Sequence, residues 1–179
     1  MTPRGRRRAD AHEIAPGVIQ HKQPDSLDVG AFPRPSIPVA EQEHVARNLV
    51  RIYSASGKTY HRYDASVALN RWRKLVCNTC LDPISTLAGL DTGTLQLDHR
   101  SMETLVKPDM LEVSQVAATL GHHFPGNIID TMIASNYVER RISLGMLLEL
   151  RKGNSIEHEN LPGEVVREAN YTLSAPRCP

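Results

Sequence analysis

The segment from Arg71 to Pro83, RWRKLVCNTCLDP, constrains the fold of this chain more than any other stretch. If it is helical, Lys74, Asn78 and Asp82 share one face, because steps of four residues drift by only about 40° around a helix axis. The apolar residues of the segment lie on neighbouring faces and should be buried: Trp72, Leu75, Val76 and Leu81. The polar face is therefore expected at the edge of a hydrophobic core.

Lys74 at such an edge could act as a proton donor, because partial burial lowers the pKa of an ammonium group towards neutrality. The other interpretation is an ordinary helix whose exposed lysine stem covers core residues. The spacing K-x-x-x-N recurs often by chance, so spacing alone favours the ordinary helix.

The surrounding residues decide between these interpretations. The run RWRKLVCNTCLDPISTLAGL resembles the start of the C-terminal domain of the ketopantoate reductase (2-dehydropantoate 2-reductase) family, K-L-x-x-N-x-x-x-N-P followed by an apolar helix. A second segment, Gly145 to Glu164, resembles the other signature of that family, S-M-x-x-D followed by T/I-E and N-x-x-G. Two signatures in the right order, about eighty residues apart, are more specific than either alone. The likeness covers roughly Gly17 to Pro176.

The resemblance implies a mainly α fold. Its core would be an all-helical domain of six or seven helices, similar to the C-terminal domain of 6-phosphogluconate dehydrogenase, with a short β remnant at the N-terminus. Residues 1–16, with the basic cluster Arg4 to Arg8, are expected to be a disordered tail. Residues 17–38 would be a remnant of the nucleotide-binding domain with a proline-rich linker, and residues 39–179 the helical domain.

The resemblance also implies roles for five positions. Lys74 aligns with the general acid of the family, Glu157 with a catalytic glutamate that contacts the substrate and helps set the protonation of the lysine, and Asn78 with a substrate-binding asparagine. Asp82 and Gly145 occupy substrate-binding positions where the family pattern has Asn and Ser. A carboxylate at Asp82, about 4 Å from the substrate carboxylate, would cost on the order of 4 kcal/mol at an effective dielectric near 20.

The implied activity is the reduction of ketopantoate to pantoate with NADPH, for pantothenate and coenzyme A synthesis in the cytoplasm. Of the 11 glycines, none falls into the G-x-G-x-x-G pattern of a dinucleotide site, so NADP is implied by the resemblance and by no motif of this chain. Most of the Rossmann domain is expected to be missing. The chain would then need a complementing nucleotide-binding domain, or would form a homodimer.

Two other functions remain open. A truncated, inactive paralogue could serve as a helical interaction or dimerisation module through the face left exposed. A redox or metal protein would use the C-x-x-C of Cys77 and Cys80, but two small buried thiols are the simpler interpretation. The net charge of +1 argues against nucleic acid as a partner, and no apolar run is long enough to cross a membrane.

Local patterns predict the individual elements. Val18–His21 and Leu27–Gly30 should form a hairpin, and Lys58–Tyr63 a short strand. Apolar periodicity predicts helices over Val39–Tyr53 and Asp109–Leu120, with Gly121 as the stop. Asp64 fits the N-cap of the helix that carries Lys74, Pro83 should kink or break that helix, and Pro162 should begin the last one.

Overall fold

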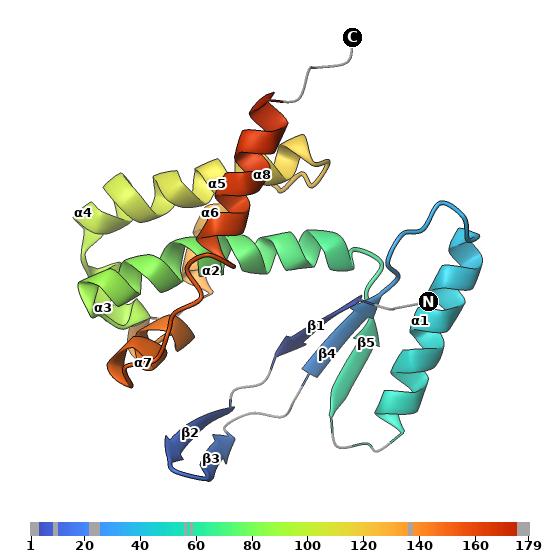
Figure 1. The fold of residues 1–179 in the computed structure, drawn as a ribbon, viewed down its shortest axis with the longest axis horizontal. Coiled ribbons are helices and arrows are strands. Elements are labelled where there is room, and N and C mark those ends of the chain that lie inside the picture. Colours follow the sequence, from blue (N-terminus) through green and yellow to red (C-terminus); the bar gives the residue numbers. More distant parts are fainter. Residues whose placement is uncertain are drawn as a thin grey trace. The chain divides into compact units, whose positions relative to one another are not determined.

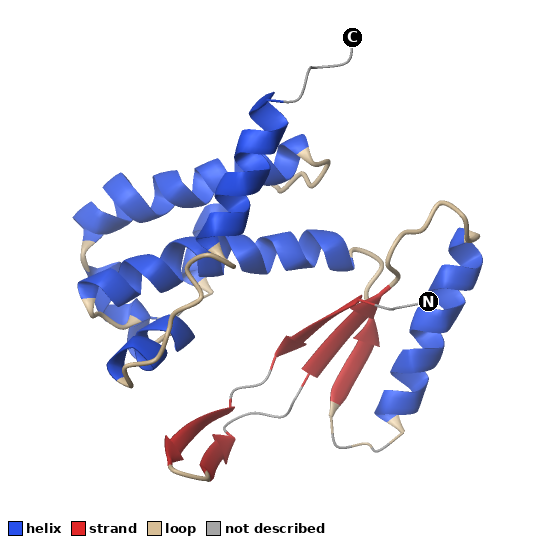
Figure 2. Cartoon of the chain, viewed as in Figure 1, coloured by secondary structure: helices blue, strands red, loops and turns tan. Residues whose placement is uncertain are grey.

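The computed structural model of the chain describes residues 4–8, 11–21, 26–55, 57, 59–135 and 138–174. The chain divides into two compact units, Met1–Arg71 and Trp72–Pro179. In the first unit the described residues form strands and a helix, and in the second they form helices joined by loops (Figure 2). None of the helices in the described ranges combines the length and apolarity that crossing a bilayer requires.

The first unit contains a three-stranded sheet in the order β1-β4-β5 and a two-stranded sheet of β2 and β3 (Figure 1). The strands are β1 Arg4–Arg8, β2 Ala11–Ala15, β3 Val18–His21, β4 Ser26–Gly30 and β5 Tyr60–Tyr63. β4 pairs antiparallel with β1 and parallel with β5. The strand predicted within Lys58–Tyr63 is confirmed as β5.

Two predictions for the N-terminal region were wrong. The segments Val18–His21 and Leu27–Gly30 are strands but do not pair with each other, because β3 pairs with β2 and β4 pairs with β1. Their partners lie in the stretch 1–16, which was expected to be disordered and which instead contains β1 and β2. Backbone pairing explains both errors, since a strand whose main chain bonds to a neighbour needs no strong apolar alternation of its own.

The predicted bounds of helix α1 (Val39–Ser54) are correct to within one residue. The helix lies in the first unit with the strands, however, and not in the helical domain. It contacts β4 and β5, and the Arg47 guanidinium carbon lies 3.9 Å from the centroid of the Tyr63 ring. At its start the buried Gln42 side chain accepts a hydrogen bond from the Arg34 N–H at 3.0 Å and donates one to the Ile37 carbonyl at 2.7 Å. The boundary between the units therefore lies after Arg71, not after residue 38.

Helix α2 (Val67–Ala88) runs without a break through Pro83, so the predicted break was wrong and the predicted kink stays a prediction. A proline inside a helix removes one N–H and crowds the preceding turn, at a cost of about 3 kcal/mol. Burial on both sides of Pro83 offsets that cost. Val76 and Cys80 before it are fully buried, and Ile84 after it packs against the core.

Asp64 holds the start of α2, although it lies three residues before the first helical residue. Its carboxylate accepts hydrogen bonds from the Ser66 N–H at 2.9 Å and from the Asn70 side-chain amide at 2.8 Å. The N-cap prediction was therefore wrong in position, because Asp64 holds a turn that precedes the helix.

The remaining helical elements fold back on α2 in the second unit (Figure 1). They are α3 Thr92–Leu97, α4 His99–Ser101, the π-helical turn η1 Met102–Val106, α5 Lys107–Thr119, α6 Ile128–Ala134, the 3-10 turn η2 Val138–Arg140, α7 Gly145–Arg151 and α8 Pro162–Ser174. α4, η1 and α5 follow one another without a gap. Gly121, with φ of 82°, ends this run as predicted, and Pro162 begins α8 as predicted.

The core of the second unit is built from six of these elements, α2, α3, η1, α5, α6 and α8. Its buried members are Val76, Cys80, Leu81, Leu95, Met102, Val106, Met110, Val113, Met132 and Val165. The apolar face predicted for 109–120 is confirmed, since Met110, Val113 and Ala117 are all buried. A mainly α fold with short strands at the N-terminus is confirmed with it.

Candidate active site

The polar face of α2 runs from solvent into the interior of the second unit. Lys74 is exposed, Asn78 is half-buried, and Asp82 is only 7% exposed. Each step of four residues rises about 6 Å along the axis, so the three side chains start at three depths. The expectation that Lys74 would be partly buried was wrong, because its side chain lies at the solvent end of the face.

Asp82 shows which groups the fold brings together. Burial raises the pKa of its carboxyl to about 6, the Lys74 ammonium lowers it, and the Glu157 carboxylate raises it. Lys74 and Glu157 are therefore both close enough to act electrostatically on the same buried carboxyl. This electrostatic influence on Asp82 links three of the five predicted positions, although Glu157 lies far from α2 in the sequence.

Glu157 is placed by the turn that leads into α8. Its carbonyl accepts a hydrogen bond from the Leu161 N–H at 3.1 Å, and the carbonyl of His158 accepts one from the Gly163 N–H at 3.0 Å. These bonds compact the segment before Pro162, the first residue of α8. The Glu157 side chain is exposed, like that of Lys74, so both remain accessible from solvent.

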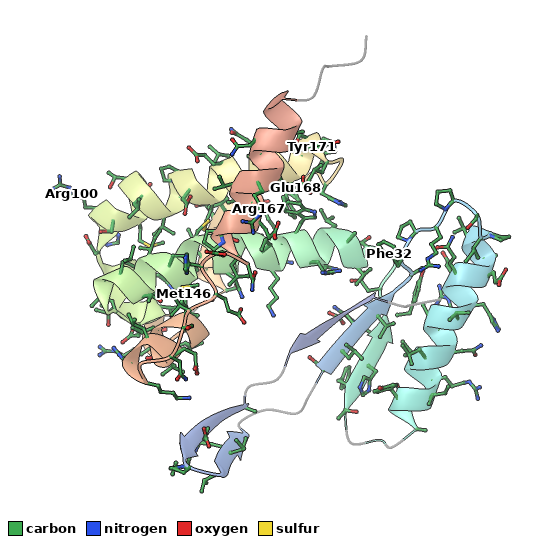
Figure 3. All side chains as sticks on the ribbon, in the orientation of Figure 1. Phe32, Arg100, Met146, Arg167, Glu168 and Tyr171 are labelled. Carbon is green, nitrogen blue, oxygen red and sulfur yellow. The ribbon has the colours of Figure 1, made fainter. Side chains whose placement is uncertain are left out.

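Gly145 is the first residue of α7, and it is exposed. A Cβ built on it would meet nothing within 4 Å, and its neighbour Met146, labelled in Figure 3, is buried. In the described part of the chain no interaction joins Gly145 to the other four predicted positions. Its place in the site therefore stays a prediction.

Glu149, which aligns with the Asp of the second signature, has local partners. Its carboxylate accepts hydrogen bonds from the Asn154 side-chain amide at 2.5 Å and from the Lys152 ammonium at 3.2 Å. The bond from Asn154, followed by that from Lys152, lowers the pKa of Glu149. This residue stabilises the end of α7.

Ser85 is the polar residue of this face that sequence analysis did not single out. It lies 11 residues after Lys74, which returns it to within about 20° of the lysine around the helix axis. Its side chain is fully buried, and its hydroxyl has no hydrogen-bond partner among the described residues. Ser85 lies three residues after Asp82, a spacing that would have placed both on one helix face. This was missed because the helix was expected to kink or break at Pro83.

Of the two described cysteines, Cys80 lacks the character of a redox or metal-binding thiol. Cys80 is fully buried, and burial, reinforced by Asp109, raises the pKa of its thiol far above the ordinary value. Such a thiol is a poor nucleophile and a poor metal ligand. Within the described ranges, no three His, Cys, Asp or Glu side chains cluster as a metal site would require.

The junction from β4 to α1 is where a strand-turn-helix site would hold a nucleotide phosphate. Pro33, Pro35 and Pro38 lack the backbone N–H groups that would bind it, and Glu41 places a carboxylate in the first turn of α1. Gly30 is required by packing instead, since a Cβ there would lie 2.4 Å from the Asp64 carbonyl oxygen. This junction therefore does not fit a dinucleotide.

Comparison with known proteins agrees with the resemblance seen in the sequence. Residues 66–178 match the family model described as "Ketopantoate reductase PanE/ApbA C terminal". An uncharacterized protein of Saccharomyces cerevisiae, YDL144C, is 30% identical over 161 residues, which are 88% of this chain and 44% of that protein.

Solved structures show the same relationship. The crystal structure of 2-dehydropantoate 2-reductase from Methylococcus capsulatus is 28% identical with a TM-score of 0.77, and the match covers 97% of this chain and 53% of that one. D-mandelate dehydrogenase, solved with NADH and anilino(oxo)acetate, has a TM-score of 0.80 at 16% identity, over 97% of this chain and 55% of that one, and shows likeness of fold alone. The chain spans about half the length of these relatives.

The helical second unit is thus the C-terminal domain of a class of oxidoreductases. The match over residues 66–178 is specific enough to go one step further. The chain belongs to the ketopantoate reductase family.

Proposed function

We propose that this chain supplies the substrate-binding and proton-donating half of a 2-dehydropantoate 2-reductase, which reduces ketopantoate to pantoate with NADPH in cytoplasmic pantothenate synthesis. The observation that carries the proposal is the family match over residues 66–178, and the electrostatic influence of Lys74 and Glu157 on the buried Asp82 carboxyl supports it. NADPH would be held outside the β4–α1 junction, by a nucleotide-binding domain.

In this proposal Lys74 donates a proton to the keto oxygen as that oxygen becomes a hydroxyl, and its charge attracts the substrate carboxylate. Glu157 keeps the lysine oriented through its opposite charge. Asn78, one turn along α2 and half-buried, offers an amide that can donate to and accept from the substrate. Because Lys74 is exposed here, water would be excluded by the substrate and by the domain that brings the nucleotide.

Asp82 changes the charge of this site with pH. With a pKa of about 6 it is mostly ionised at neutral pH, where it works against an anionic substrate. Below that pH its neutral carboxyl can donate a hydrogen bond, as the asparagine amide of the family pattern can.

Ketopantoate titration of the purified chain tests the proposal. We expect Lys74→Met to weaken ketopantoate binding at least about tenfold, because a hydrogen bond to a charged group contributes roughly 1.5–3 kcal/mol. The matched control is Lys152→Met, which removes an exposed lysine at the end of α7 and should leave binding unchanged. Isothermal titration calorimetry gives both constants. The proposal fails if the unmodified chain binds no ketopantoate at millimolar concentration, or if both variants bind alike.

Gly145 allows a gain-of-binding prediction. Open space around its Cβ position means that Gly145→Ser fits without moving a neighbour, and the variant restores the hydroxyl of the family pattern. One added hydrogen bond should tighten ketopantoate binding about fivefold. Gly145→Ala, which adds the Cβ without the hydroxyl, is the control. Equal affinities of the two variants would place Gly145 outside the site.

The second candidate is a helical interaction or dimerisation module without catalysis. Exposed apolar side chains on α8 favour it, with Val166 58% and Tyr171 73% exposed. Tyr171 is labelled in Figure 3. Light scattering at rising concentration separates the candidates when it is combined with the titration. Self-association without ketopantoate binding would support the module.

A further inference from the structure

Lys74, Asp82 and Glu157 together carry more negative charge than a site for a simple 2-oxo acid needs. Lys74 contributes one positive charge, whereas Asp82 and Glu157 each contribute a negative one when ionised. An asparagine in place of Asp82 would leave the three positions neutral overall. The family signature has that asparagine, so this chain holds one extra negative charge against a ligand that is itself an anion.

Ser85, near Asp82 on α2, has a buried hydroxyl whose hydrogen-bonding capacity is unsatisfied in the described part of the chain. Its hydroxyl lies one turn beyond Asp82, on the same side of α2, and neither side chain is more than 7% exposed. The hydroxyl has no partner among the described residues. A buried polar atom without a hydrogen bond destabilises a fold, so it calls for an explanation such as a bound water or ligand.

We propose that Asp82 and Ser85 bind the far end of the 2-oxo acid and select a group there that donates hydrogen bonds, above all an ammonium. The substrate class is then a zwitterion, with its carboxylate at Lys74 and its cationic end at Asp82. This inference rests on the proposed function, because it assumes that Lys74 receives the carboxylate. Along the axis of α2 the Cα atoms of Lys74 and Asp82 are about 12 Å apart.

Three ligands with one skeleton test the selection. They are 2-oxo acids built on 3,3-dimethyl-2-oxobutanoate that carry hydrogen, hydroxyl or ammonium on carbon 4, the hydroxyl compound being ketopantoate. Each is titrated calorimetrically into the full chain at about pH 7.5, where Asp82 is ionised. We expect the ammonium ligand to bind at least about tenfold more tightly than the hydrogen ligand, with ketopantoate between them.

Three variants assign the effect to its residues. Asp82→Asn should remove the preference for ammonium, and Ser85→Ala should weaken ketopantoate a few-fold while it leaves the hydrogen ligand unchanged. Asp130→Asn, the same exchange at a carboxylate that is 74% exposed on α6, should retain the full preference.

Equal binding of the three ligands, or a preference for ammonium that survives in Asp82→Asn, would overturn this inference and leave the proposed function standing. Absence of binding for all three, ketopantoate included, would overturn the proposed function and this inference together. The two failures are therefore distinguishable in one set of titrations.

Discussion

Asp82→Asn should stabilise the chain by about 2–3 kcal/mol at neutral pH. The ordinary pKa of an aspartate is 3.8, and in the folded chain that of Asp82 is raised to about 6, first by burial. A pKa higher by one corresponds to about 1.36 kcal/mol of free energy. Above pH 6 the folded chain therefore carries the cost of a buried charge that asparagine does not have. Asparagine is close in shape to aspartate, so the packing around α2 should be kept.

The pH dependence gives this prediction its sign. The unfolded chain loses the Asp82 proton near pH 3.8 and the folded chain near pH 6, so the folded state binds more protons between these values. The contribution of this group to stability is fully present below about pH 4, falls as the pH rises to 6, and stays lost above it. The advantage of Asp82→Asn should therefore vanish near pH 4 and be complete above pH 7.

Urea unfolding at about pH 4 and 7.5 measures both effects. Asp130→Asn is the control, because its carboxylate is 74% exposed and should contribute little at either pH. A destabilised Asp82→Asn variant at neutral pH would show that the ionised carboxylate is needed by the fold. That result would also remove the physical basis for a charge-selective site.

Helices of this chain could be predicted where the local sequence alone determines their position. Val39–Ser54 and Lys107–Thr119 have one-sided apolar patterns, and Gly121 and Pro162 mark helix ends by their own backbone chemistry. The failures concern interactions between distant segments. The partner of β4 is the arginine-rich β1, and the continuity of α2 through Pro83 depends on burial that its sequence alone does not reveal.

In the candidate site, too, local patterns could be predicted from the sequence and contacts between distant segments could not. Periodicity places Lys74, Asn78 and Asp82 on one face, but not the depth of each, because depth depends on which other helices cover α2. Nothing local to Glu157 indicates its approach to Asp82; only the family resemblance did. Ser85 follows the helical period, and the expected break at Pro83 concealed it.

Gly93→Ala should destabilise the second unit by about 3 kcal/mol or more. Gly93 is buried in the first turn of α3, and a Cβ added to it would lie 2.1 Å from the Val138 carbonyl oxygen, well inside van der Waals contact. The obstacle is backbone, so no side-chain rotation relieves the clash. η2 would have to move away, and with it the hydrogen bond from the Thr92 N–H to the Ile142 carbonyl, 3.0 Å long in the native fold.

Gly145→Ala separates this packing effect from the general effect of replacing glycine in a helix. It also lies in a first helical turn, but its added Cβ meets open space, so we expect no loss and a gain of at most about 1 kcal/mol from helix propensity. Thermal unfolding of both variants beside the unmodified chain measures the difference. If Gly93→Ala unfolds at the same temperature as Gly145→Ala, the contact between α3 and η2 can yield without cost.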